Sequence, residues 1–257
     1  MQFVLFSCQK DKAMEGQGIQ LPLECNASEE FSIHYYLHLF AIDRDNRIAR
    51  HETFTSSHIH DNTLHAILPL GRYRLALVAN APEESIVIPE TGEALESLFL
   101  CLPHEENTNQ EANDISTALQ SVSITESKNT LPPIRLFRRT GVVLFSLHAI
   151  PEAISNLKLE LSFVPSSVSF SGSTTNTFGT ITKPVDHQGK AMIRTFPTKK
   201  GEATLSITYD EDNKSKRKII PFSEAIDTNQ IIHVDCNFPE LTEGGIQGNG
   251  ENLLQNG

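Results

Sequence analysis

Hydrophobic and polar side chains alternate with a period of two along much of the chain, as in strands that lie with one face on a core. The first clear segment covers residues 33–42, where apolar side chains occupy every second position from Ile33. Asp43-Arg44-Asp45-Asn46 follows, and Asp and Asn favour turns because their side chains bond to the nearby backbone. We therefore expect a hairpin whose returning strand covers residues 48–54.

Two further strands, at residues 64–68 and 72–78, are predicted in the first half. Leu68-Pro69-Leu70-Gly71 joins them, since Pro presets φ at the second position of a type I turn and Gly suits the fourth. Between Thr91 and Leu102 the apolar intervals become three, one and three, which predicts a short amphipathic helix over a sheet edge or an open end. Residues 103–114 have no apolar period and are predicted to form a surface loop.

The second half alternates more regularly than the first. Strand patterns recur at residues 142–147, 157–163, 168–170, 192–196, 203–209 and 232–238. Their number and spacing are typical of a β-sandwich, and the lack of long helical patterns disfavours parallel βαβ architectures. The sequence thus predicts an all-β protein of two β-sandwich domains in series, with at most short helices.

Polar and Pro-rich stretches divide the chain into four parts. Residues 1–30 are expected to form a leader and tether, of which residues 9–30 are polar and charged. A polar stretch ending in Pro132-Pro133 is expected to separate a first sandwich, residues 31–133, from a second, residues 134–240. The tail, residues 241–257, is rich in Gly, Asn and Gln and is predicted to be disordered.

The charge balance is acidic. Among 257 residues there are 32 Asp and Glu against 21 Lys and Arg, a formal net charge of −11, which excludes a nucleic-acid partner held by bulk positive charge. The basic run at residues 214–218 stands beside Asp210-Glu211-Asp212, and we expect the two to neutralise each other around a hairpin. No apolar run reaches the roughly 18–20 residues that a membrane-crossing helix needs.

Few residues are arranged for chemistry. His58, His60 and His65 are the candidate metal ligands. His58 and His60 would share a face on a strand, which suits a metal ion, but their polar neighbours favour solvated loop histidines. Residues 43–46 resemble the start of a calcium loop, yet the glycine and the terminal glutamate of an EF-hand are missing. With no Gly-x-Ser-x-Gly motif and no Gly-rich phosphate loop after a strand, we expect no enzyme activity, no metal and no cofactor.

The first eight residues end in Leu5-Phe6-Ser7-Cys8, which resembles a bacterial lipobox, where a small residue precedes the cysteine that becomes acylated. Cys8 is therefore the expected lipid attachment residue, and two acyl chains give lasting membrane attachment. The following Gln9-Lys10-Asp11 resembles the signal that sends lipoproteins of the Bacteroidetes phylum to the outside of the outer membrane. The alternative is a buried first strand with an incidental cysteine. Cys25, Cys101 and Cys236 allow at most one intramolecular disulfide, and their spacing indicates no zinc site.

Leu68-Pro69-Leu70-Gly71-Arg72-Tyr73-Arg74-Leu75, followed by Val78-Ala79-Asn80, resembles the LPxGxYxL…AN segment of Bacteroidales fimbrial proteins. Residues 37–43 resemble the strand and hairpin that precede this segment, and residues 135–143 resemble the arginine-bearing strand that opens the second domain of the FimB-like anchor subunits. The chain is identified by these motifs as similar to the FimB-like fimbrial anchor and accessory lipoproteins. The resemblance implies two transthyretin-like β-sandwiches in series.

Within that family, shaft subunits lose an N-terminal strand to a protease that cuts after arginine, and a neighbour's strand fills the groove. Here the first arginine is Arg44, inside the predicted hairpin, although Lys10 or Lys12 would suit a different protease. The tail also lacks the apolar alternation of a donor strand. The resemblance thus implies a surface lipoprotein of the outer membrane, an anchor or accessory subunit that binds fimbrial subunit proteins through a sheet edge.

Alternatives remain open for the function and for three arginines. A surface adhesin or glycan-binding module on the same lipid anchor is the second hypothesis, against which the absence of Trp and the presence of only 4 Tyr count. A secreted hydrolase would need clustered carboxylates or a triad in a cleft. Arg135, Arg138 and Arg139 either contact the surface between the domains or lie on a solvated strand edge.

Overall fold

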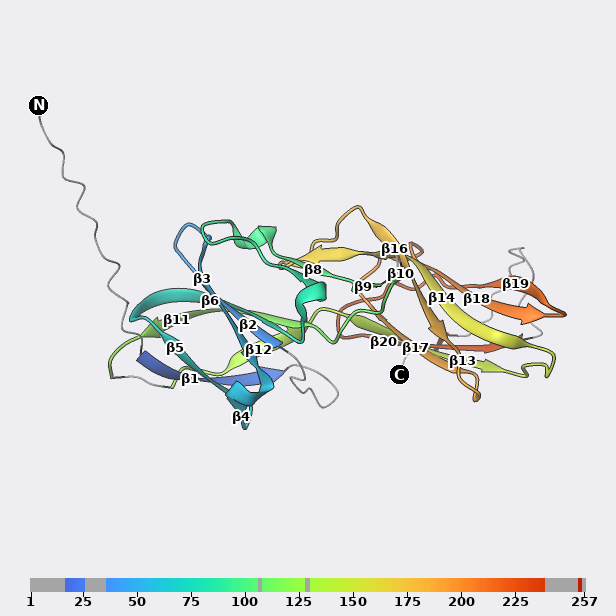
Figure 1. Cartoon of the computed structure of the whole chain (residues 1–257), viewed down its shortest axis with the longest axis horizontal. Helices are drawn as coiled ribbons and strands as arrows, with labels where there is room; N and C mark the ends of the chain where they lie inside the picture. The colour runs from blue at the N-terminus through green and yellow to red at the C-terminus, as the bar shows by residue number, and fades with distance from the viewer. Residues whose placement is uncertain (1–16, 26–35, 106–107, 128–129, 239–253, 256–257) are drawn as a thin grey trace, which may run out of the picture.

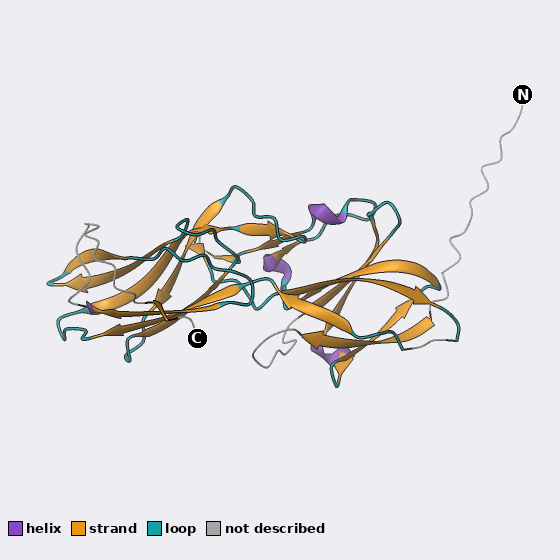
Figure 2. Ribbon diagram, turned by 180° about the vertical axis from the view of Figure 1, so that it is seen from behind, coloured by secondary structure: helices purple, strands orange, loops and turns teal. Residues whose placement is uncertain are grey.

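The computed structural model describes residues 17–25, 36–105, 108–127, 130–238 and 254–255, and this part of the chain is nearly all β. Two β-sandwiches follow one another along the long axis (Figure 1). The described helical elements are short 3-10 turns (Figure 2), η1 (Ser56–His58), η2 (Glu83–Ser85) and η3 (Leu95–Ser97). The predicted all-β architecture of sandwiches in series is confirmed. No described helix is long and apolar enough to cross a membrane.

One sheet folds over itself to form the first sandwich, with the strand order β3-β2-β6-β11-β12-β1-β5-β4. Its strands are β1 (Gln17–Cys25), β2 (Tyr36–Ile42), β3 (Ile48–Thr55), β4 (Ile59–His60), β5 (Thr63–Leu68), β6 (Gly71–Ala79), β11 (Ser116–Ile124) and β12 (Ile134–Arg138). Leu37 and Leu77 from one half share a buried cluster with Leu21 and Leu64 from the other. The apolar side chains at every second position of these strands therefore do lie in a core, as predicted.

The turn between β2 and β3 confirms the predicted hairpin. Asp43 Oδ1 accepts hydrogen bonds from the backbone N–H groups of Asp45 and Arg47, at 2.9 and 2.8 Å. Asn46 adopts a φ of 61°, in the left-handed region that Asn tolerates. The acidic residues that resemble a calcium loop thus serve the turn.

The prediction of a polar tether is wrong for residues 17–25, which form β1. This strand pairs antiparallel with β5 and parallel with β12. Its apolar side chains Ile19, Leu21 and Leu23 are 2%, 0% and 7% exposed. They follow the same period of two as the other strands. The pattern is short and lies between polar segments, so a search for longer periodic runs does not detect it.

The predicted helix between Thr91 and Leu102 is also wrong, because η3 and strand β8 (Phe99–Cys101) occupy this segment. Leu98, Leu100 and Leu102 are buried at alternate positions, as a strand requires. Tertiary pairing decides the outcome: β8 lies between β7 (Ile86–Val87) and β15 (Ser167–Ser169). The predicted loop that follows contains two short strands, β9 (His104–Glu105) and β10 (Thr108–Asn109).

Two sheets build the second sandwich, ordered β19-β18-β14-β16-β10-β9 and β17-β13-β20-β21. Their further strands are β13 (Gly141–His148), β14 (Ser155–Pro165), β16 (Phe178–Pro184), β17 (Lys190–Thr195), β18 (Thr204–Glu211), β19 (Lys214–Ile220), β20 (Ile231–Asn237) and β21 (Leu254–Gln255). The β18–β19 hairpin turns at Asp212 and Asn213, both with left-handed φ, and Lys216 Nζ lies 2.6 Å from Glu211 Oε2. Of the predicted neutralisation of charges around this hairpin, the ion pair between Lys216 and Glu211 is present.

The two sandwiches share strands and one core. β8 pairs with β15, and β10 pairs in parallel with β16, although β8 and β10 precede β11 in the chain. Phe40 and Val78, on the face of the first sheet opposite β1, lie in the same buried cluster as Phe145 and Leu161 of the second sandwich. β12 follows Pro132-Pro133 yet pairs with β1 and β11, so the first sheet continues beyond the expected boundary at residue 133.

Part of the expected organisation lies outside the described residues, including the leader, Cys8 and most of the tail. Of residues 241–257 only β21 is described, paired with β20. Cys101 is half-buried and burial raises the pKa of its thiol, while Cys236 is buried on β20. No disulfide joins these two residues, and the side chain of Cys25 lies outside the described set.

A pair of histidines lies against the first sheet. His38 Nε2 donates a hydrogen bond to the backbone oxygen of Ala81 at 2.8 Å, so His38 Nδ1 is the acceptor of the neutral ring. His51 Nε2 lies 3.2 Å from that acceptor, and the His51 ring stacks on Phe40 with centroids 4.4 Å apart. Burial lowers the pKa of His38, and burial together with the nearby His38 lowers the pKa of His51 to about 4.

We predict that stability falls as the pH drops from about 6.5 towards 4. In this range the unfolded chain binds protons at His38 and His51 that the folded protein does not, and protonation therefore favours unfolding. His51→Phe, which keeps a ring on Phe40 and removes the titration of His51, should flatten this dependence. Urea midpoints between pH 7.5 and 4 measure it. His65→Asn, at an exposed position, should leave the wild-type slope intact, and an equal slope in His51→Phe would contradict the assignment.

Candidate functional site

The groove that holds β1 is the first candidate site. On one side the register runs from Gln17 opposite Leu68 to Pro22 opposite Thr63, and on the other side Leu23 lies opposite Ile134. Alternate apolar side chains fill the core while the backbone bonds to strands on both sides. This is the geometry of β-augmentation, with a segment of the same chain as the occupant.

The segment between β1 and β2 has a composition that bears on proteolysis. It reads Asn-Ala-Ser-Glu-Glu-Phe-Ser-Ile-His-Tyr over residues 26–35 and contains neither Arg nor Lys. β1 contains none either, and the first Arg or Lys after β1 is Arg44, in the turn beyond β2. A protease that cuts after Arg or Lys thus has no bond within residues 17–43 at which to separate β1 from β2.

Two of the longer strands lie at the edges of their sheets. β3 ends the first sheet and β19 ends a sheet of the second sandwich. β19 carries Lys214, Lys216, Arg217 and Lys218, and Lys side chains on an edge oppose pairing with another chain. β3 carries no Lys, and its Arg50 pairs with Glu52, so β3 is the less protected edge beyond Ile48, whose backbone already bonds to Gly92 and Glu93.

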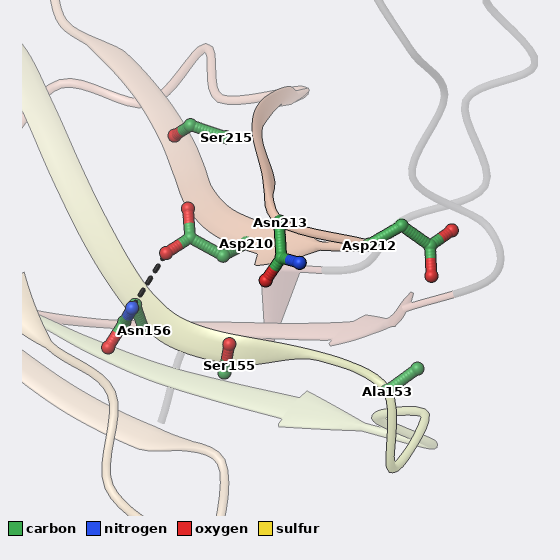
Figure 3. Close-up of a pocket in the computed structure, with 7 residues that line it drawn as sticks. All are labelled: Ala153, Ser155, Asn156, Asp210, Asp212, Asn213 and Ser215. Carbon is green, nitrogen blue, oxygen red and sulfur yellow. Dashed lines mark hydrogen bonds between the residues drawn. The ribbon is translucent and has the colours of Figure 1, made fainter.

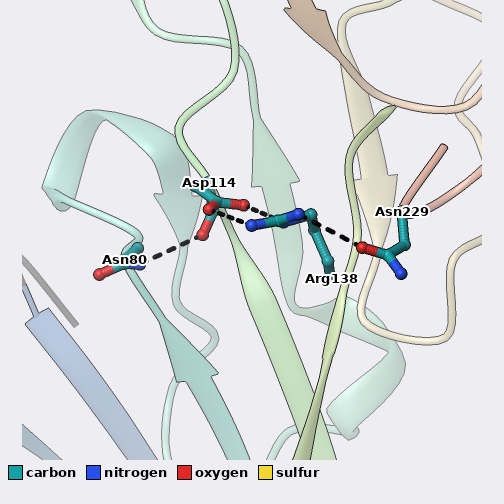
Figure 4. A network of polar contacts seen from close by, with 4 residues as sticks. All are labelled: Asn80, Asp114, Arg138 and Asn229. Atoms are coloured by element: carbon teal, nitrogen blue, oxygen red, sulfur yellow. Dashed lines mark hydrogen bonds and ion pairs between the residues drawn. The ribbon is translucent and has the colours of Figure 1, made fainter. Parts of the chain in front are cut away.

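Arg138 joins the two sandwiches (Figure 4). Its guanidinium binds Asp114 through Nε–Oδ1 at 2.5 Å and Nη2–Oδ2 at 2.8 Å, and Nη1 donates to Asn229 Oδ1 at 3.3 Å. Asn80 Nδ2 donates to the backbone oxygen of Asp114 at 3.3 Å. The Arg138 side chain is 6% exposed and that of Asp114 is 24% exposed, so this two-pronged pair is largely shielded from water at the joint.

The other two candidate arginines divide between the two expected roles. Arg139 donates to Thr117 Oγ1 at 2.5 Å and to the backbone oxygen of Phe170 at 3.1 Å, which links the first sheet to the second sandwich. Arg135 is exposed on β12 and reaches Glu24 at 3.3 Å. Arg138 and Arg139 thus lie at the surface between the sandwiches, and Arg135 lies on a solvated strand.

A polar hollow of about 500 Å³ opens at the far end of the second sandwich (Figure 3). Asp210 and Asp212 line it, and Asn156 Nδ2 donates to Asp210 Oδ2 at 2.6 Å. Within the described residues no group of three His, Cys, Asp or Glu is placed to hold a metal ion.

The structure brings the candidate histidines to the surface. His58 lies in η1, where its Nδ1 accepts a hydrogen bond from the backbone N–H of Thr55 at 3.3 Å. His60 and His65 are exposed, with ring centroids 6.3 Å apart. One nitrogen of His58 is thus used by the local turn.

The sequence profile of the fimbrillin-A associated anchor proteins Mfa1 and Mfa2 matches residues 26–247. The chain belongs to this family. Among functionally curated proteins, none matches the sequence significantly. The Mfa1 and Mfa2 anchor family is a fimbrial one, so its membership confirms the resemblance to Bacteroidales fimbrial anchor and accessory proteins.

Solved structures share the fold of this anchor-family member. The fimbrial anchor protein Mfa2 from Porphyromonas gingivalis is 14% identical, with a TM-score of 0.55 over 88% of this chain and 93% of that one. A fimbrial assembly protein from Parabacteroides distasonis is 10% identical, with a TM-score of 0.57 over 88% and 93%. A proposed cell adhesion protein from Bacteroides eggerthii is 11% identical, with a TM-score of 0.65 over 94% of each chain.

Family membership gives the role in outline. The protein is a fimbrial anchor or accessory subunit, it acts at the cell surface, and it interacts with fimbrial subunits. The groove around β1 and the edge of β3 are the features of this family member that bear on how such an interaction is made.

We predict that Arg138→Ala lowers the free energy of unfolding by about 3 kcal/mol, because it leaves Asp114 without its charged partner at the joint. Arg135→Ala is the matched control, since its ion pair is solvated, and it should cost less than about 1 kcal/mol. Chemical denaturation of both variants measures the difference. Equal losses in the two variants would show that the Arg138 pair does not stabilise the joint.

Proposed function

We propose that this protein is a non-enzymatic lipoprotein of the outer membrane that anchors a fimbrium or serves as its accessory subunit. Cys8 carries the lipid, and the residues between Cys8 and β1 form the tether. Family membership and the lipobox-like Leu5-Phe6-Ser7-Cys8 support this assignment. The first sandwich then stands nearest the membrane.

The absence of Arg and Lys from residues 17–43 carries the distinction from a shaft subunit. Release of an N-terminal strand opens the groove in which a neighbour's strand would bind. Here an Arg- or Lys-specific protease leaves β1 joined to β2, and cutting at Lys10 or Lys12 would separate β1 from Cys8 but not from its groove.

Because β1 stays attached to the chain, it outcompetes a separate donor strand for the groove by mass action. A tethered segment meets its own groove at an effective concentration on the order of millimolar, which a separate donor strand rarely reaches. Ile19, Leu21 and Leu23 add burial that a competitor would have to replace. We propose that the first sandwich therefore accepts no donor strand and that chain growth stops at it.

The edge of β3 is the surface that we propose for the fimbrial partner. Beyond Ile48, which bonds to Gly92 and Glu93, its backbone lies at the end of the sheet, and the Arg50–Glu52 ion pair leaves its charge balanced. A partner strand added there would extend the first sheet by main-chain hydrogen bonds.

Cys8→Ala should move the full-length protein from the membrane to the soluble fraction, because it removes the thiol that would carry the lipid. Immunoblots of cell fractions measure the distribution. Cys101→Ala, which removes a half-buried thiol of the folded part, is the matched control and should stay with membranes. Membrane retention of Cys8→Ala would overturn the lipid attachment.

A protease site inserted between Ser28 and Glu29 tests whether β1 closes the groove. After cutting with a site-specific viral protease and removal of β1 in mild denaturant, the protein should bind a labelled peptide of residues 17–24. The uncut protein should not bind it, and the peptide with Leu21→Asp should fail with both. Equal peptide binding by cut and uncut protein would show that β1 is no barrier.

A further inference from the structure

A β-bulge in the second sandwich points a bulky aromatic ring into solvent. The pairing of β14 with β16 shifts between Ser162 and Val164, and Phe163 between them has no partner in the register. Leu161 and Val164 are fully buried, whereas Phe163 is 58% exposed. The extra residue of the bulge thus re-aims one side chain while the strand keeps its inward alternation on both sides.

Phe163 is unfavourable for the fold in two ways. Its φ is 60°, in the left-handed region that bulky residues avoid. Its ring also exposes apolar surface that burial would stabilise. Strained backbone of this kind concentrates at ligand sites, where the surrounding structure holds it.

Two more exposed apolar side chains lie around the same hollow. Phe178 on β16 is 46% exposed and Ile219 on β19 is 45% exposed. Together with Phe163 they line a hollow of about 460 Å³ on the sheet surface, within the range of small-ligand sites. Three strands therefore contribute one apolar side chain each to a single concave surface.

Hydroxyl groups complete the lining of this hollow. Ser162, Thr180 and Thr204 lie among its lining residues, and Thr180 Oγ1 donates to Ser162 Oγ at 3.0 Å. Hydroxyls donate and accept, so they can match ligand hydroxyls in either sense. A surface of aromatic rings beside hydroxyl groups suits a ligand with an apolar face and a hydroxylated rim.

The charge at the hollow is balanced. Arg217 is its one charged lining residue, and this guanidinium lies 3.3 Å from Glu160 Oε2 and donates to Ser206 Oγ at 2.9 Å. A phosphate or an acidic peptide would compete with Glu160 for that cation. The local neutrality therefore favours an uncharged ligand.

We propose that this hollow is a binding site for neutral saccharides. One hexose ring would lay its C–H face on Phe163 or Phe178 and direct its hydroxyls to Ser162, Thr180 and Arg217. Phe supplies the aromatic surface here, in a chain that contains 14 Phe and no Trp. The site lies on the second sandwich, apart from β1 and β3, and does not depend on the anchor role.

The test uses ¹⁵N-labelled folded protein and a panel of neutral tetrasaccharides of glucose, mannose and galactose. At least one should bind saturably at millimolar concentration or below and shift the amide signals of Ser162, Thr180 and Ile219. The variant Phe163→Ala with Phe178→Ala should weaken binding at least about tenfold. Phe137→Ala, at a Phe that is 50% exposed on β12, is the matched control and should bind as wild type.

Phe163→Gly separates binding from folding, because Gly adopts the left-handed φ without strain. It should weaken saccharide binding while thermal stability stays unchanged or rises. Inorganic phosphate and vesicles of phosphatidylglycerol serve as anionic probes. Failure of the whole saccharide panel, binding of the anionic probes alone, binding unaffected in the double variant, or a clear loss of stability in Phe163→Gly would each overturn the proposal.

Discussion

The part of the first sheet formed by β2 and β6 is buried on both faces, and this constraint shapes the rest of the molecule. On β2 and β6 the adjacent residues Leu39 and Phe40, and Leu77 and Val78, are all buried although they point to opposite sides. β1, β5 and β12 cover one face, whereas the segment around η3 and the second sandwich cover the other. A sheet of this kind needs a layer on each side. Separation of the two sandwiches would therefore expose a core and not merely a polar joint.

Local patterns predict the strands whose neighbours in the sequence are also their neighbours in space. The β2–β3 and β18–β19 hairpins follow from alternation and turn residues alone. β8 and β1 are missed because their form depends on distant partners, β15 and β12, that no local window contains. The same limit holds for function: Arg138 is a candidate from its place in the sequence, but Asp114 and Asn229, 24 and 91 residues away, carry no recognisable signal.

The features that bear on function lie at separate places. β1 closes a groove in the first sandwich, β3 leaves an edge of that sandwich open, and the hollow around Phe163 lies on the second. Composition predicts none of the three by itself. The lack of Arg and Lys between β1 and β2 bears on function only because the structure shows β1 bound in its groove. A search for period-two alternation cannot detect the bulge that turns Phe163 outward, because the bulge breaks that alternation.

Strand β1 has a mechanical consequence if the chain is tethered through Cys8. Tension from the membrane would enter at Gln17 and run along the strand, which is bonded to β5 on one side and to β12 on the other. A force along the strand loads all the hydrogen bonds between β1 and its neighbours in shear, instead of opening them one after another. Detachment of β1 therefore requires many hydrogen bonds to break at once. Resistance to such pulling is set by the rate of unfolding under force and not by equilibrium stability.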